Sequence, residues 1–236
     1  MKKVILFDFD GVILQSRSAN SIIAKKASLY TWKQLVRHTH KSNSHVKDHT
    51  HTVKDAESIC ANLYKSYGHT LLGLKAIGFE NAKLTDYNKY IYDDIDYTDL
   101  VKHNNNMDIL YGVIDYCHIN DISPYIFTNS PRKWVESMLS DHSSIVKDLP
   151  DVRSILSIDD TDETFLKPMN LVYDTIEKQF VNERLYFIDD NACNFQSTLK
   201  RKRWTHMLYC SVNKKISDNM YFINDLSQAI EIMKRD

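Results

Sequence analysis

The stretch Ile5–Leu14 reads ILFDFDGVIL and decides the fold of this chain. Two carboxylates, Asp8 and Asp10, stand in a run that is otherwise apolar apart from Gly11. Val4–Phe7 is short, apolar and prone to extended structure, so it predicts a buried strand. A charged group there costs several kcal/mol unless it is paired, hydrogen-bonded or bound to a metal. The rest of the sequence must therefore supply a partner for the two aspartates.

The composition is that of an ordinary globular protein. The chain has 236 residues, 43% of them hydrophobic, and a net charge of -1. This charge does not favour nucleic-acid polymers or membranes as partners. No apolar run approaches the ~20 residues of a membrane span, and the N-terminus lacks the apolar region of a signal peptide. The four cysteines are far apart, which indicates free thiols in a reducing compartment and predicts a cytoplasmic protein.

Secondary structure is predicted to alternate between strands and helices in the C-terminal half. Strands are expected after residue 121 (ISPYIF), at Val152–Ile158, at Arg184–Ile188 and at Thr205–Cys210. Helices are expected at Met107–Cys117, Arg132–Ser140, Asn170–Phe180, Asn194–Lys200 and Leu226–Met233. Such alternation indicates βαβ units and a parallel sheet with helices on both faces.

About a hundred mostly helical residues separate the first strand from the others. A helix is expected at Ser18–Val36, a polar loop from Arg37, a second helix capped by Asp55, and a further helix in Leu84–Val101. We therefore predict an α/β fold, a doubly wound parallel sheet with an inserted all-helical cap. The core would comprise residues 1–14 and 106–236, and the cap residues 15–105.

Polar side chains follow three of the predicted strands. In an open parallel sheet, ligands bind beyond the carboxyl ends of the strands. We therefore expect these side chains to converge on one crevice: Asp8, Asp10, Thr128, Asn129, Asp189 and Asp190. Because Asp8 and Asp10 are two residues apart, an extended chain would point both to the same side.

Four crowded carboxylates repel one another, and a hard divalent cation removes that repulsion. Mg²⁺ fits best, since it binds one or two carboxylates plus a phosphate. Thr128 offers a hydroxyl and Asn129 an amide to phosphate oxygens, and Gly11 lets the backbone turn closely around the phosphoryl group. Lys167 is the candidate cation on the other side of the phosphate. It precedes Pro168, which suits the first turn of a helix.

These motifs, in this order, resemble those of the haloacid dehalogenase (HAD) superfamily of phosphatases: FDFDGVI, YIFTNS, LKP and YFIDDN. The resemblance implies that Asp8 is a nucleophile that becomes phosphorylated, and that Asp10 is the general acid and then the general base. It implies Thr128 and Lys167 as phosphate ligands. It also implies a Mg²⁺ ion bound directly by Asp8, the Asp10 carbonyl and Asp189, with Asp190 assisting through water or as a ligand.

The helical insertion is similar to the cap of the pyrimidine 5'-nucleotidase branch. The similarity lies in ANLYKSYGHTLLGLKA and DYNKYIYDDIDYTDLV, whereas residues 37–53 look like an addition to that cap. It implies a Mg²⁺-dependent phosphomonoesterase acting on a nucleoside 5'-monophosphate, with a cap that closes over this small substrate and sets specificity. A sugar-phosphate phosphatase, a phosphomutase and a non-catalytic binding protein remain alternatives. We expect a monomer or a homodimer.

Several other residues allow a functional or a structural interpretation. Five histidines fall within residues 38–51 without a metal-binding pattern, which favours a polar loop over a metal site: His38, His40, His45, His49 and His51. Cys193 follows the last acidic pair and is interpreted as a small buried residue rather than a redox thiol. In the cap, Tyr64, Tyr67, His69 and Lys75 could contact a base or ribose, although most such residues pack helices together.

Overall fold

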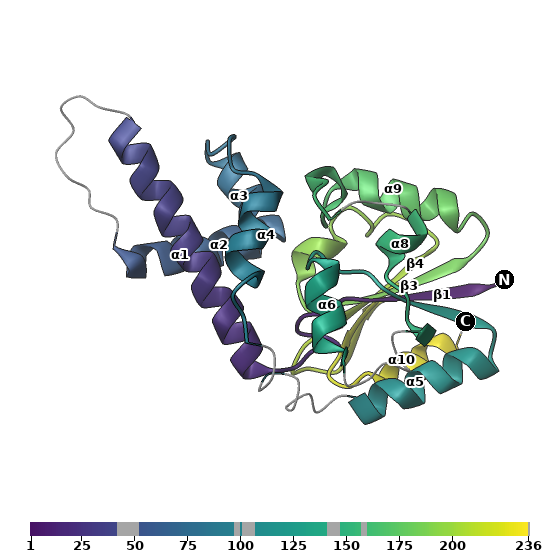
Figure 1. Ribbon diagram of the computed structural model, residues 1–236. Coiled ribbons are helices and arrows are strands. Elements are labelled where there is room, and N and C mark those ends of the chain that lie inside the picture. The colour runs from purple at the N-terminus through teal and green to yellow at the C-terminus, as the bar shows by residue number, and fades with distance from the viewer. Residues whose placement is uncertain (42–51, 97–99, 101–106, 141–146, 157–159, 236) are drawn as a thin grey trace. The chain divides into compact units, whose positions relative to one another are not determined.

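The core of this protein is a six-stranded sheet in the order β2-β1-β3-β4-β6-β5 (Figure 1). The computed structural model describes residues 1–41, 52–96, 100, 107–140, 147–156 and 160–235. The strands are β1 (Lys3–Phe7), β2 (Ile122–Ile126), β3 (Arg184–Asp189), β4 (Trp204–Tyr209), β5 (Lys214–Ser217) and β6 (Met220–Ile223). Neighbouring strands are parallel except β5 and β6, which are antiparallel. The predicted α/β fold class is confirmed.

Strand β1 lies between β2 and β3 and fixes where three loops leave the sheet. Phe7 pairs with Ile126 of β2 and with Ile188 of β3. Val4 through Phe7 are buried, as expected of a strand that is covered on both faces. Because the three strands are parallel and end at the same level, the loops that follow them emerge at one edge of the sheet.

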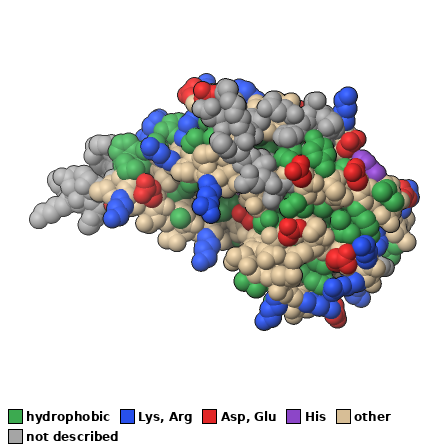
Figure 2. Space-filling view, turned by 90° about the horizontal axis from the view of Figure 1, so that it is seen from below, with side chains coloured by type: hydrophobic (Ala, Val, Ile, Leu, Met, Phe, Trp, Pro, Cys, Tyr) green, Lys and Arg blue, Asp and Glu red, His purple; other side chains and the backbone are tan. Residues whose placement is uncertain are grey.

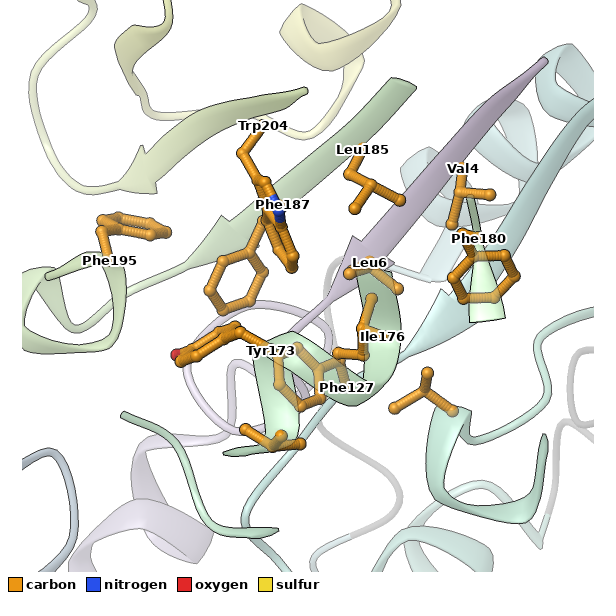
Figure 3. Close-up of a cluster of buried hydrophobic side chains, with 12 residues drawn as sticks. Val4, Leu6, Phe127, Tyr173, Ile176, Phe180, Leu185, Phe187, Phe195 and Trp204 are labelled. Atoms are coloured by element: carbon orange, nitrogen blue, oxygen red, sulfur yellow. The ribbon is translucent and has the colours of Figure 1, made fainter. Parts of the chain in front are cut away.

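One face of the sheet packs against α9 (Asn170–Gln179). Figure 3 shows Leu6 of β1 and Phe187 of β3 on the same side as Tyr173 and Ile176 of the helix. Strand residues alternate between faces, so the neighbouring Ile5 and Phe7 belong to the opposite side. Burying a side chain of this size contributes roughly 1.5–3 kcal/mol, which offsets the cost of placing charges at the end of the sheet.

Helices cover both faces of the sheet. Figure 1 shows α8 (Val152–Leu156) and α9 on one side, and α5 (Met107–Ile119) and α10 (Ser227–Met233) on the other. A further helix, α6 (Arg132–Met138), follows the loop after β2. Two short 3₁₀ segments are η3 (Glu163–Phe165) and η4 (Ala192–Phe195).

The chain divides into two compact units, Met1–Ser16 with Asp96–Asp236 and Arg17–Ile95. The second, which we call the helical unit, contains α1 (Arg17–Lys41), α2 (Val53–Tyr67), α3 (Thr70–Ala76) and α4 (Leu84–Tyr92). Gly68 ends α2 in the left-handed conformation that glycine adopts without penalty. His69 is buried and caps α3, because its ring accepts a hydrogen bond from the backbone N–H of Leu71.

Two predicted boundaries in the helical unit are wrong. Helix α1 continues to Lys41, beyond the predicted end at Val36, so His38 and His40 lie within it. Helix α2 is capped by Thr52 and not by Asp55. Asp55 is the third helical residue, and its carboxylate accepts hydrogen bonds from Thr52 in a capping box. The other three histidines of the cluster lie outside the described residues.

Three predictions in the core are also wrong. The predicted strand Val152–Ile158 contains α8, because the Asp151 carboxylate accepts a hydrogen bond from the Arg153 backbone and starts a helix. The predicted helix Asn194–Lys200 is instead the end of η4 followed by turns. Pro168 was expected in the first turn of a helix, but it precedes α9, whose N-cap is Met169. The β5–β6 hairpin was not anticipated.

The surface mixes charges of both signs. Figure 2 shows Lys and Arg side chains interspersed with Asp and Glu over the face in view. Among the described helices, none is long and apolar enough to cross a membrane. All four cysteines are free thiols, and Cys193 is buried as predicted.

Candidate active site

The loops after β1, β2 and β3 bring the predicted polar residues together. The backbone N–H of Asp8 donates to Ile188 O at 2.8 Å, so Asp8 extends the pairing of β1 with β3 beyond the end of the strand. One oxygen from each of Asp8, Asp189 and Asp190 lies within 4.8 Å of the others. The three carboxylates therefore form one acidic cluster at the carboxyl edge of the sheet.

Lys167 is the cation at the centre of this cluster. Its Nζ lies 2.9 Å from Asp8 Oδ1 and 2.6 Å from Asp189 Oδ2, and its side chain is almost completely buried. Burial alone would lower the pKa of Lys167, but the neighbouring carboxylates of Asp189 and Asp8 outweigh it and raise the pKa. Lys167 therefore stays charged and neutralises part of the cluster.

The two adjacent acids after β3 differ in their surroundings. Asp189 is fully buried, and both of its oxygens accept hydrogen bonds, from Lys167, the Asn191 backbone and the Asn194 side chain. Asp190 is exposed as a whole residue, but surrounding groups desolvate its carboxyl group. This desolvation and the repulsion by Asp189 raise the pKa of Asp190 to about 7. Asp189 thus connects three neighbouring groups by hydrogen bonds, whereas the Asp190 carboxylate is more accessible to a ligand.

The carboxyl group of Asp8 is also buried, which disfavours its charged form. Burial raises the pKa of Asp8 well above its ordinary value; Lys167 opposes this shift, whereas Asp189 and Asp190 reinforce it. Crowding of this kind is relieved by a bound cation, and the donor set consists of carboxylate oxygens alone. Such oxygens are the ligands that Mg²⁺ and other hard cations prefer. The residues present therefore fit a divalent metal.

Asp10 does not point where the extended-chain argument placed it. The strand ends at Phe7, and the chain turns after Asp8, with Leu14 N–H donating to Phe9 O at 2.8 Å. The Asp10 carboxylate accepts hydrogen bonds from Ser130 Oγ at 2.5 Å and from Trp134 Nε1 at 2.9 Å. Among the described residues, the acidic cluster does not include Asp10. Burial raises the pKa of Asp10, although both hydrogen bonds oppose this shift.

Gly11 is required at its position for two reasons. Its φ of 85° lies in the left-handed region that side chains rarely adopt. A Cβ atom at Gly11 would also stand 2.2 Å from Asp190 Oδ2. The absence of a side chain thus allows Asp190 to approach the loop after β1.

Thr128 and Asn129 play different parts in the loop after β2. The Thr128 hydroxyl oxygen accepts a hydrogen bond from Ser130 N–H at 3.1 Å, which leaves its own proton available to a ligand. The Asn129 amide donates to Lys167 O at 2.9 Å and accepts from Lys167 N–H at 2.7 Å. Its side chain therefore fixes the backbone of Lys167, whereas the sequence had suggested a contact with phosphate.

Sequence reasoning missed four residues that support the site. Ser130 and Trp134 hold Asp10, and Asn194 holds Asp189. The buried guanidinium of Arg153 donates to Ser130 O at 2.6 Å and pairs with Asp151 and Asp160. Ser130 and Asn194 lie next to motif residues and could have been suspected for that reason. Nothing in the local sequence distinguishes Trp134 or Arg153 from ordinary core residues.

Comparison with known proteins finds similarity in three dimensions. No protein-family model matches the sequence, and no curated protein matches it. A β-phosphoglucomutase candidate from Thermotoga maritima aligns over 99% of both chains, with a TM-score of 0.52 and 10% identity. A HAD-superfamily hydrolase from Geobacter sulfurreducens aligns over 98% of this chain and 96% of its own, with a TM-score of 0.49 and 12% identity. A HAD-hydrolase candidate from Bacillus subtilis, bound to magnesium, covers 98% of both chains at a TM-score of 0.48 and 14% identity.

Two of these neighbours are described as HAD hydrolases and one as a β-phosphoglucomutase candidate. The similarity to the Thermotoga maritima protein shows that this chain shares the fold of that protein, a mostly parallel sheet between helices.

Proposed function

We propose that this protein is a Mg²⁺-dependent phosphomonoesterase that works through a phosphorylated Asp8. The observation that carries the proposal is the pairing of a nearly buried Asp8 with Lys167, beside Asp189 and Asp190 at the open edge of the sheet. A carboxylate that is oriented by a buried cation is suited to attack an electrophile that the same cation attracts. A phosphate monoester is such an electrophile.

The first step is attack by Asp8 on phosphorus. Lys167 binds Asp8 Oδ1, which orients Oδ2 for the attack. The new bond joins Asp8 to phosphorus, and the bond from phosphorus to the ester oxygen breaks. Asp10 gives its proton to the departing oxygen. In the second step water attacks phosphorus, and Asp10 takes the proton from water. The bond between phosphorus and Asp8 breaks, so inorganic phosphate leaves and Asp8 is a carboxylate again.

Asp10 suits this exchange of a proton. Burial raises its pKa, so the protonated form is accessible, while Ser130 and Trp134 stabilise the ionised form by hydrogen bonds. A group that must first donate and then accept a proton works best when neither form is strongly disfavoured. Ser130 and Trp134 are positioning residues in this scheme.

Asp8 and Asp190 are the residues that we expect to hold the metal directly. Asp189 already accepts hydrogen bonds from three different donors, whereas the sequence suggested Asp189 as a direct ligand and Asp190 as an assisting one. Bound there, a divalent cation neutralises negative charge on the phosphoryl group and lets the carboxylate approach. The Thr128 hydroxyl and Lys167 would bind the phosphate oxygens, and Gly11 leaves room for the phosphoryl group.

A nucleoside 5'-monophosphate is the substrate class that we propose, with a pyrimidine base favoured by the resemblance of the helical unit. The test is phosphate release from a panel of nucleoside monophosphates and sugar phosphates, with Mg²⁺ and with EDTA. We expect release that requires Mg²⁺ and is fastest with a nucleotide. Equal rates on sugar phosphates would refute the nucleotide preference, and an isomerised sugar phosphate would indicate a phosphomutase. Absence of metal-dependent release from every compound would refute the enzyme proposal.

A further inference from the structure

The helical unit contains a cavity that has no lining residue in common with the residues proposed for hydrolysis. The cavity has a volume of about 470 Å³ and opens between α1, α4 and the segment that joins α3 to α4. That volume lies within the range of small-molecule sites in proteins. All of its lining residues belong to the helical unit, so its properties can be derived from that unit alone.

The α1 wall of the cavity is basic. Lys33 and Arg37 line it, and both side chains are exposed. They lie four residues apart on one helix, where two like charges destabilise the helix slightly. Within the described part of the chain, neither forms an ion pair with Asp86 on the opposite wall. An anionic group of a ligand would compensate this pair.

Aromatic rings form another part of the lining. Tyr30, Phe79 and Tyr90 contribute to the cavity, and the Lys33 ammonium lies 4.2 Å from the centroid of the Tyr90 ring. Tyr30 and Tyr90 are in contact, with ring centroids 5.7 Å apart. Such surfaces bind planar rings by stacking. The Lys33 ammonium thus lies over the Tyr90 ring, on the aromatic side of the lining.

The α4 wall supplies an acid and the connecting segment an amide. Asp86 and Asn81 line this side of the cavity. Burial raises the pKa of Tyr30, Asp86 raises it further, and Arg37 lowers it, so the phenol lies within electrostatic reach of both walls. A carboxylate opposite two cations matches a ligand with an anion at one end and an amino donor at the other.

We infer that this cavity binds a nucleoside monophosphate that carries an exocyclic amino group. Lys33 and Arg37 receive the phosphate, the aromatic side of the lining contacts the base, and Asp86 accepts a hydrogen bond from the amino group. The inference is independent of the proposed hydrolysis, since none of these residues belongs to the acidic cluster.

Binding of adenosine 5'-monophosphate to the full-length protein tests the inference. Calorimetry is run in EDTA, and phosphate release is followed in the same samples so that hydrolysis is recognised separately. Adenosine and inorganic phosphate serve as probes that lack the anion or the ring. We expect both to bind at least tenfold more weakly than the nucleotide. Binding of phosphate alone as tight as that of the nucleotide would overturn the inference, and so would equal binding of adenosine.

Charge reversal locates the site. We expect Lys33→Glu to weaken nucleotide binding at least tenfold, whereas Lys25→Glu, at an exposed position of the same helix, leaves it unchanged. Arg37→Glu is the second variant, and circular dichroism checks that each protein is folded. If both cavity variants bind the nucleotide like the wild type, or if no binding is detected in the wild type, the inference is wrong.

Discussion

The acidic cluster and the cavity of the helical unit use charge in opposite ways. In the cluster, Asp8 and Asp189 are buried, and each forms an ion pair with the buried Lys167. Around the cavity, Lys33, Arg37 and Asp86 are exposed. Groups that must react are held in place before the substrate arrives, because motion at the reacting atoms costs rate. Groups that only recognise a ligand can stay solvated.

The largest contrast is expected for loss of a single carboxylate. Asp8→Asn should lower the rate of phosphate release by about 10³-fold or more while the fold survives, because the amide cannot act as the nucleophile. The matched variants are Asp115→Asn on an exposed face of α5 and Glu57→Gln on the helical unit. Both should retain the wild-type rate. Near-normal turnover by Asp8→Asn would show that Asp8 is not the nucleophile.

Loss of the buried cation should affect stability next most strongly. Lys167→Met leaves Asp8 and Asp189 without their shared partner, so we expect the free energy of unfolding to fall by about 3–5 kcal/mol. Lys54→Met, on an exposed position of the helical unit, should change it by less than about 0.5 kcal/mol. Chemical denaturation measures both. Equal stability of the two variants would mean that the cluster is not held together as described.

The two buried histidines allow the units to be compared by pH. Burial lowers the pKa of His206 in the core and of His69 in the helical unit to about 4. In the unfolded chain each titrates near 6.5, so the unfolded state binds more protons between these values. Stability is therefore fully present above pH ~6.5 and falls towards pH ~4, by about 3 kcal/mol for each histidine.

Hydrogen exchange can assign this loss to each unit. His206→Gln should reduce the pH dependence of the core amides alone, and His69→Asn that of the helical unit alone. The asparagine keeps a side-chain acceptor at the N-cap of α3. If either variant changed the pH dependence of exchange equally in both units, the two units would unfold in one shared transition. The stabilities of the two units could then not be compared separately.

The smallest effect is expected from a methyl group. In Gly11→Ala, the new Cβ atom would lie 2.2 Å from Asp190 Oδ2, and alanine would have to adopt a φ of 85°. We expect the free energy of unfolding to fall by about 1–3 kcal/mol, and the main visible effect to be lost activity. Gly112→Ala adds the same group to α5, where nothing lies within 4 Å, and should stabilise the protein by up to about 1 kcal/mol. Full activity of Gly11→Ala would show that Asp190 does not need its present position.

The sequence is informative where chemistry and topology coincide. Val4–Phe7 could be recognised as a buried strand, and the polar residues after it follow from the rule that parallel strands present ligands at their carboxyl ends. The hydrogen bonds that Asp189 accepts from Asn191 and Asn194 could not be predicted, because they depend on the course of the loop after β3 in three dimensions. Only the resemblance to a known family, and not the two residue types, gave Asp189 and Asp190 different expected roles.

Other features depend on residues without a local signal. Residues 152–156 are β-prone in composition, yet the Asp151–Arg153 contact makes them helical. In the sequence, Lys33 and Arg37 look like ordinary solvated residues of a helix. Only the three-dimensional structure shows that they line a cavity together with aromatic rings. Hydrophobic periodicity reports which side of a helix is buried, but it does not report what lies opposite the exposed side.

The most direct test of the central claim is chemical trapping of phosphorylated Asp8 during turnover. Borohydride reduces an acyl phosphate to an alcohol, which converts the modified aspartate to homoserine, and peptide mass spectrometry then locates the change. We predict homoserine at position 8 in samples with Mg²⁺ and the best substrate of the panel, and none when substrate is omitted. Reduction at a different carboxylate, or rapid turnover with unmodified Asp8, would contradict the account.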